Sequence, residues 1–163
     1  MISYQLYNTM ILSPIPYLGT ACLWGTITRH QRKKIFDRER KYYLCDHLLW
    51  YVYLGDTYQW YGKLYENIVY TTLLYYGYQV FVGKWDIWEV DFIAQQNNKQ
   101  IYFQIAYLLA DDAIIQREYQ SLQSIADNRP KYVLSGDDVL LKPLDWIVHH
   151  HIWDLEDIIQ RSL

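Results

Sequence analysis

Residues 89–106 decide the fold, and they read EVDFIAQQNNKQIYFQIA. Two runs rich in β-branched and aromatic residues, 89–94 and 100–107, lie on either side of the turn-forming Asn97-Asn98-Lys99. Such runs around a short turn predict two strands joined as a hairpin.

The segments around this hairpin alternate between helical and extended patterns. Residues 60–77 carry an apolar stripe at helical spacing, and Gly77 stands where a helix C-cap is expected. Acidic residues favour the positive end of a helix dipole, so Asp111-Asp112 predicts a helix start. The other expected elements are a strand at 78–82 with a turn at Gly83-Lys84, a helix to 125, strands at 131–134 and 146–151, and a helix at 154–161. This order predicts a mixed α/β fold with one sheet.

The first 54 residues predict short helices and one hairpin with a basic tip. Pro14 and Pro16 end the first helical pattern because proline cannot continue a helix. The expected elements are helices at 3–12 and 17–24, strands at 24–28 and 41–44 around a charged connector at 30–40, and a helix at 46–54.

The chain of 163 residues has the size of one domain, and its 52% apolar and 20% charged residues exclude a disordered chain. Its net charge of −3 conceals an asymmetry. Residues 1–41 hold seven basic and two acidic side chains, whereas 42–163 hold eight basic and sixteen acidic ones. All seven basic residues of the first part lie between Arg29 and Lys41, so this stretch is the expected attractor for a polyanion.

Two cysteines are too few for a disulfide framework, and no secretory signal is visible. The Tyr- and Leu-rich run at 42–61 contains Asp46 and Asp56, so no membrane span is expected there. We therefore expect a cytoplasmic protein without a membrane partner.

The chain has neither a phosphate-binding loop nor a G-x-S-x-G turn. Three other polar positions are the candidates for a functional site. They are Glu66 on the long helix, Asp91 on one hairpin strand and Gln104 on the other. Alternation along a strand puts Gln104 and Ala106 on the same face. One or two carboxylates suffice to hold Mg²⁺, and a lysine two residues after the third position would orient a metal-bound water for phosphodiester hydrolysis.

From about residue 41 onward, the chain resembles the C-terminal domain of unknown function of prokaryotic AAA-type ATP-binding proteins. That domain resembles the restriction-endonuclease-like PD-(D/E)XK superfamily. The matching blocks lie in the same order and span roughly three quarters of the chain: residues 41–47, 62–70, 77–78, 82–84, 89–94, 101–107, 117–119, 130–135 and 146–150.

The resemblance implies a restriction-endonuclease-like mixed sheet flanked by helices at 46–163, after a partial winged-helix segment at 1–45. In that segment, residues 3–12 would form the recognition-type helix. Residues 30–41 would form the wing. Phosphate contacts by Arg29, Arg32, Lys33 and Lys34 would then add salt-sensitive affinity without reading bases. A solvated charged loop is the alternative for this basic stretch.

The resemblance also assigns roles at the site. Glu66 matches the helix acid and Asp91 the strand acid, and both would bind metal in an active enzyme. Gln104 stands where a metal-binding Glu is expected, and Ala106 stands where the lysine is expected. Gln supplies a carbonyl oxygen without charge, so the site is interpreted as degenerate. Lys63, Lys84 and Arg117 are the candidates for a substitute cation.

Each of these residues also has a structural interpretation. Glu66 can be a helix-surface acid paired with Lys63, and Asp91 can be a hydrogen-bonding hub. Gln104 is more typical of a satisfied core amide than of a catalytic group. Arg117-Glu118-Tyr119 is more typical of a solvated helix face bearing an ion pair than of a phosphate clamp.

The histidine run at 149–151 is not expected to bind metal. Only His149 and His151 share a face of a strand, and two ligands are too few for a closed zinc site.

The leading hypothesis is a catalytically degenerate nuclease-like domain that binds nucleic acid or another protein, with DNA and an ATPase as expected partners and no cofactor. One alternative is an active Mg²⁺-dependent DNA endonuclease with a migrated lysine. The other is a dimerisation module without a nucleic-acid role, suggested by the 18 Tyr and 7 Trp residues.

Overall fold

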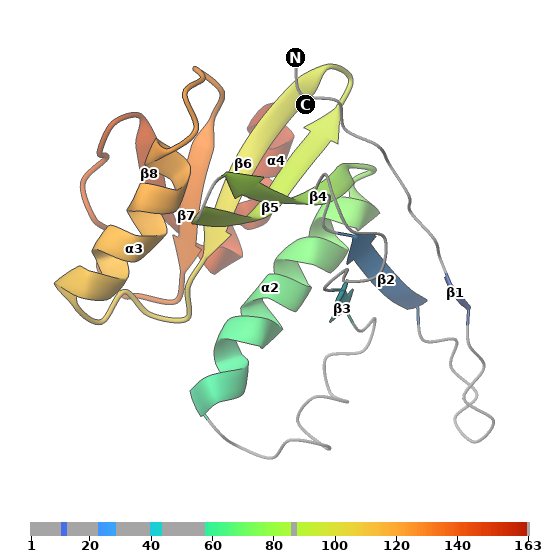
Figure 1. Ribbon diagram of the computed structural model, residues 1–163, viewed down its shortest axis with the longest axis horizontal. Coiled ribbons are helices and arrows are strands. Elements are labelled where there is room, and N and C mark those ends of the chain that lie inside the picture. The colour runs from blue at the N-terminus through green and yellow to red at the C-terminus, as the bar shows by residue number, and fades with distance from the viewer. Residues whose placement is uncertain (1–10, 13–22, 29–39, 44–57, 86–87, 163) are drawn as a thin grey trace.

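A five-stranded mixed sheet flanked by helices forms the centre of the computed structural model, which describes residues 11–12, 23–28, 40–43, 58–85 and 88–162. The strand order is β4-β5-β6-β7-β8 (Figure 1). The strands are β4 (Gln79–Trp85), β5 (Trp88–Gln96), β6 (Lys99–Ile105), β7 (Lys131–Ser135) and β8 (Ile147–His151). The first three pair antiparallel and the last three pair parallel.

The hairpin of β5 and β6 forms as predicted, with Asn97 and Asn98 in the turn and Lys99 already paired in β6. Phe92 lies opposite Phe103, and Gln96 lies opposite Lys99. Asn97 and Asn98 have φ angles of 48° and 66°, a left-handed conformation that Asn tolerates better than most residues. The predicted turn between these two strands is therefore confirmed.

The predicted turn at Gly83-Lys84 is wrong, because β4 continues through both residues to Trp85, which pairs with Trp88. The register shifts between Phe81 and Gly83 instead. A glycine inside a strand commonly marks such a bulge, which keeps the chain extended while bending it.

The two faces of the sheet carry different helices. The α2 helix (Tyr58–Tyr75) and the α4 helix (Leu155–Ser162), which follows the short η1 turn (Ile152–Asp154), share one apolar cluster with Phe92 and Phe103. The α3 helix (Asp112–Gln123) packs its Tyr119 and Leu122 with Tyr102 in a second cluster. Figure 1 shows α3 in front of β7 and β8, and α4 behind the sheet.

The predicted helix boundaries are confirmed where capping residues mark them. The Asp111 carboxylate accepts a hydrogen bond from the backbone N–H of Ile114 at 2.8 Å, as an N-cap does. Gly77 follows α2 with a φ angle of 80°. The N–H of Tyr78 donates to the Leu73 carbonyl at 3.0 Å, which closes the C-terminal turn. No helix in the described ranges is long and apolar enough to cross a membrane.

The strands from β4 onward form the one mixed sheet that was predicted, and a second, three-stranded antiparallel sheet precedes α2. Its strands are β1 (Ile11–Leu12), β2 (Leu23–Thr28) and β3 (Arg40–Tyr43). The pairing of β2 with β3 confirms the predicted hairpin.

The two predicted N-terminal helices are wrong at their last residues. Residues 11–12 and 23–24 are extended and pair with each other. Short apolar segments fit a helix or a strand equally well by their periodicity, and here pairing with a distant segment makes them strands. The rest of both predicted helices, the basic connector and the predicted helix at 46–54 lie outside the described residues.

The C-cap of α2 generates a stability prediction. Gly77→Ala should lower the free energy of unfolding by about 1–2 kcal/mol, because a Cβ strains the left-handed backbone and would lie 3.1 Å from the Gln96 Nε2 atom. Gly62→Ala is the matched control inside α2, where a Cβ meets nothing within 4 Å. It should raise stability by up to about 1 kcal/mol. Urea denaturation measures both variants, and equal effects would contradict the capping role.

Candidate functional site

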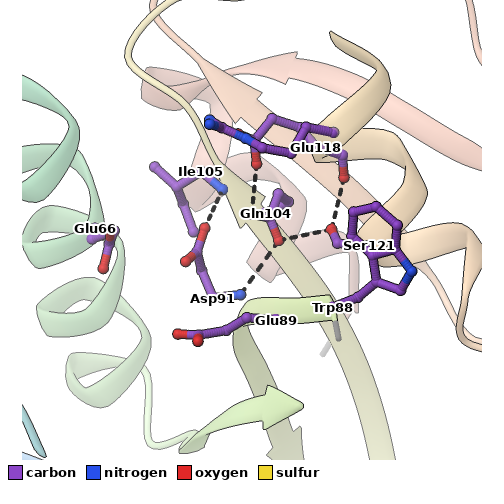
Figure 2. A pocket seen from close by; sticks show the side chains of 9 residues that line it. Glu66, Trp88, Glu89, Asp91, Gln104, Ile105, Glu118 and Ser121 are labelled. Atoms are coloured by element: carbon purple, nitrogen blue, oxygen red, sulfur yellow. Dashed lines mark hydrogen bonds and ion pairs between the residues drawn. The ribbon is translucent and has the colours of Figure 1, made fainter. Parts of the chain in front are cut away.

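The three predicted site residues Glu66, Asp91 and Gln104 line one cavity of about 380 Å³. Figure 2 shows Glu66 on α2 at one side, Asp91 and Gln104 at the sheet, and Glu118 and Ser121 on α3 at the other side. The residues that line the cavity are Glu66, Trp88, Glu89, Asp91, Gln104, Ile105, Arg117, Glu118 and Ser121. The structure therefore brings together residues from α2, β5, β6 and α3.

Asp91 lies where β5 and β6 cease to pair. The ladder between these strands ends at the pair of Phe92 and Phe103. Beyond it, the Asp91 Oδ2 atom accepts a hydrogen bond from the backbone N–H of Ile105 at 3.0 Å. Asp91 is only 8% exposed, so this contact satisfies a buried carboxylate with a strand N–H that the ladder no longer uses.

Gln104 is the central hydrogen-bonding residue of the cavity. Its Nε2 group donates to the Glu118 Oε2 atom at 2.6 Å. Its Oε1 atom lies 3.1 Å from the Ser121 hydroxyl, whose one proton is shared with the Glu118 backbone carbonyl at 2.7 Å, and accepts from the backbone N–H of Asp91 at 3.4 Å. The amide thus joins β5, β6 and α3, and its carbonyl oxygen is committed to protein donors. These contacts agree with the interpretation of Gln104 as a satisfied core amide.

Glu118 is a functional candidate that sequence reasoning missed. It is 5% exposed, and its Oε1 atom accepts from the Arg117 Nε group at 2.9 Å and from the Arg117 terminal nitrogen. The predicted solvated face is therefore wrong for Glu118 and also for the buried Tyr119, although the predicted ion pair is present. The spacing of Ile115, Tyr119 and Leu122 was the available signal, because it turns this side of α3 toward the sheet.

The cavity carries an excess of negative charge. Four carboxylates, those of Glu66, Glu89, Asp91 and Glu118, face one guanidinium, that of Arg117. The Arg117 side chain is 68% exposed, so it stands at the solvent side of its ion pair. Within the described ranges, no three His, Cys, Asp or Glu side chains form a group that could hold a metal ion.

The candidate substitutes for the missing lysine differ in position. Ala106 donates its N–H to the Leu134 carbonyl at 2.9 Å, and its side chain packs in the apolar cluster under α3. Of the proposed replacements, Arg117 lines the cavity. Lys63 is exposed on α2 and does not line it, and the side chain of Lys84 lies outside the described part of the structure.

Tyr43 connects the N-terminal sheet to this region, and its role was not visible in the sequence. Its ring stacks on Tyr70 with centroids 4.1 Å apart and lies 5.7 Å from Phe92. Burial raises the pKa of its hydroxyl well above the ordinary value, and the carboxylates of Glu66 and Asp91 raise it further. The tyrosine therefore stays protonated beside the acids, and its buried hydroxyl makes no hydrogen bond with the residues that the structure describes.

The predicted nucleic-acid contacts Arg29, Arg32, Lys33 and Lys34 lie outside the described residues. The strands β2 and β3 that precede and follow this stretch are described, and they pair as a hairpin.

Comparisons with known proteins give one informative relative. An uncharacterized protein of Haemophilus influenzae is 35% identical over 96 residues, which cover 59% of this chain and 23% of that protein. The chain therefore matches less than a quarter of the relative's length. No family model matches the chain, and no solved structure matches it.

The Gln104 network predicts a pH-dependent loss of stability in Gln104→Glu. The introduced carboxyl group would face the Glu118 oxygen that now lies 2.6 Å from the amide nitrogen. Repulsion should raise the pKa of the introduced group above about 4.3. The folded state then holds a proton that the unfolded state releases, so stability falls as the pH rises through the raised pKa.

Relative to the unsubstituted protein, this variant should lose about 1–3 kcal/mol at neutral pH and less below pH 4. Gln104→Met is the control of similar length, and its loss should not depend on pH. Urea denaturation across the pH range measures the difference. A penalty of equal size at every pH in both variants would contradict the charge argument.

Proposed function

We propose that residues 46–163 form a restriction-endonuclease-like domain that no longer hydrolyses phosphodiesters and acts by binding nucleic acid. The observation that carries the proposal is the placement of Gln104, whose amide is tied to Asp91, Ser121 and Glu118 where an active enzyme would carry a metal-binding acid. The order of α2, three antiparallel strands, α3 and the parallel β7 supports the resemblance on which the proposal rests.

Hydrolysis in such a site would need a metal ion held by acids and a cation near the attacked phosphate. The carbonyl oxygen of Gln104 is neutral and already faces two protein donors. Ala106 packs into the apolar cluster and offers no charge. The site therefore keeps the carboxylates of Glu66 and Asp91 but lacks the third metal-binding acid and the lysine that hydrolysis would use.

Nucleic-acid binding is proposed to lie on the basic stretch of the N-terminal hairpin rather than in the acidic cavity. The cavity repels phosphate, because its carboxylates outnumber its one guanidinium. The basic stretch with Arg29, Arg32, Lys33 and Lys34 connects β2 to β3 along the chain. As the wing of a partial winged helix at 1–45, it would contact phosphates rather than base edges. The same resemblance implies an ATPase module as partner.

A second candidate function is an active Mg²⁺-dependent endonuclease, and the position of Arg117 favours it. This side chain supplies a positive charge at the cavity that Ala106 cannot supply. Glu118 places a carboxylate within 2.6 Å of the Gln104 amide, on α3 rather than on the strand. In this alternative, Asp91, Glu66 and Glu118 would hold the metal after the amide contact opened.

A nuclease assay separates the two candidates. With Mg²⁺ or Mn²⁺ and plasmid or linear DNA, we expect the unsubstituted protein to cleave no faster than Asp91→Asn. The asparagine oxygen can still accept the Ile105 N–H, so this variant removes the charge and keeps the contact. The loss of even one positioned electrostatic group costs about 10²–10³ in rate in other enzymes. Metal-dependent cleavage that Asp91→Asn and Arg117→Ala both abolish would instead establish the endonuclease.

The proposed hairpin contact predicts a change in the salt dependence of DNA binding. Replacing Arg29, Arg32, Lys33 and Lys34 together by Ala should weaken binding and reduce the slope of log K against log[salt] by up to about 3–4. The control removes four exposed cations of the α/β domain instead: Lys63, Lys99, Lys142 and Arg161. It should leave the slope nearly unchanged. Filter binding at several salt concentrations measures both variants, and equal slopes would contradict the assignment.

A further inference from the structure

The segment between β7 and β8, residues 136–146, has no role in the proposed nuclease-like function. It runs along the chain from the end of β7 to the start of β8 (Figure 1) and carries the exposed side chains of Val139, Leu140, Leu144 and Trp146. Trp146 is 93% exposed, and both it and Asp145 have left-handed backbones with φ angles of 66° and 49°. Non-glycine residues in this conformation persist only where surrounding contacts hold them.

The ends of this segment are held by hydrogen bonds to the loop that follows β6 and to the start of β8. At the first end, Gly136 donates its N–H to the Tyr107 carbonyl at 3.0 Å, and the Asp137 carboxylate accepts from the Leu109 N–H at 2.8 Å. At the other end, Leu144 and Ile147 exchange two backbone hydrogen bonds of 3.1 and 2.8 Å. Between the ends, the Asp145 carboxylate accepts a hydrogen bond from the Gln123 side chain of α3 at 2.6 Å, and a histidine of β8 bonds to the backbone of the segment.

That histidine is His149, which is 2% exposed on β8. The backbone N–H of Leu141 donates to its Nδ1 atom at 2.9 Å. A backbone N–H can only donate, so Nδ1 carries no proton. The proton of the neutral ring is therefore on Nε2, which donates to the Ser135 hydroxyl oxygen 2.7 Å away.

This tautomer excludes two other roles for the pair. Ser135 accepts from His149 and also, at 3.2 Å, from the N–H of Asp137, so His149 is not placed to take the serine proton as a general base. Both ring nitrogens are occupied by hydrogen bonds, so neither is available to a metal ion. The His149 contact thus holds the segment rather than forming a reactive site.

Protonation would break this arrangement at a defined atom. A proton on Nδ1 turns an acceptor into a donor that faces the Leu141 N–H, and two donors cannot bond to each other. Burial lowers the pKa of His149 below its ordinary value of 6.5. Among its charged neighbours, Asp137 raises the pKa, whereas His151 and His150 lower it.

We propose that His149 is a pH-sensitive latch that holds residues 136–146 against β8 while its ring is neutral and releases the Leu141 end of the segment in acid. Leu141 is partly buried against the apolar cluster under α3, so release would expose it beside flanking apolar side chains that are already exposed. The segment would then offer a larger apolar surface at low pH than at neutral pH.

The sign of the pH dependence follows from linkage. Between the lowered pKa of the closed form and the ordinary value, the open form binds more protons than the closed form. Acid therefore favours opening in this range, and the closed form is fully favoured above about pH 6.5. Below that pH, the equilibrium constant for opening should rise by up to about tenfold per pH unit until the closed form itself takes up the proton.

Hydrogen exchange of the Leu141 amide between pH 5 and pH 8 tests the latch, with its protection compared with that of core amides such as Leu73. We expect Leu141 to lose up to about tenfold protection per unit below pH 6.5, and to stay less protected than Leu73 at each pH, because it exchanges by local opening rather than by global unfolding. His149→Gln is the matched variant, because its amide can accept from Leu141 and donate to Ser135 without titrating. Its Leu141 protection should not vary with pH. The same pH dependence in both proteins would overturn the proposal.

Imidazole ¹⁵N chemical shifts of the unsubstituted protein provide a test that does not depend on a variant. At neutral pH, His149 should show a bare Nδ1 and a protonated Nε2. A double variant, His150→Gln with His151→Gln, should keep the latch and its acid sensitivity, because both residues lie outside the two hydrogen bonds. A protonated Nδ1 at neutral pH, or loss of the acid response in the double variant, would also overturn the proposal.

Discussion

The hydrogen bonds of one buried amide, that of Gln104, join two strands of the sheet to α3. The amide donates to Glu118 on α3, and its oxygen faces the Ser121 hydroxyl on the same helix and the backbone N–H of Asp91 on β5. A carboxylate at this position would lie between two other buried carboxylates, an arrangement that is stable only when a cation or a retained proton compensates the charge. The neutral amide lets the acids remain in the fold without such compensation.

The order of helices and strands after residue 58 was predictable from the sequence, because its signals are local. Asn97-Asn98, Gly77 and Asp111 each mark a boundary through their own backbone preference, and the apolar runs between them have clear periods. Gly83 misled the prediction, since the same freedom that suits glycine to a turn also suits it to a bulge inside β4. Residues 11–12 and 23–24 misled it because pairing between distant segments leaves no periodic signal in so short a strand.

The site was predictable only in part, because some of its residues are brought together only by tertiary packing. Alternation along β5 and β6, together with the resemblance, led to Asp91 and Gln104, and the structure places both at one cavity with Glu66. Glu118 follows an exposed arginine in sequence, so its charge indicated a solvated face. Its burial depends on how α3 packs on the sheet, which the local pattern does not specify. Tyr43 lies on β3, far from the acids along the chain, and only the tertiary fold brings its ring to Tyr70.

The separation of charge along the chain explains how a domain that keeps the acids of a nuclease site can still bind a polyanion in the proposed function. The acids are gathered at the cavity between α2 and α3, whereas the densest basic stretch belongs to the hairpin of β2 and β3. In an active nuclease, a metal ion would have to reverse the sign of the cavity before phosphate could enter. With Gln104 closing the network instead, the acids of the cavity repel the phosphate backbone, so the proposed function assigns nucleic-acid binding to the basic stretch of the hairpin.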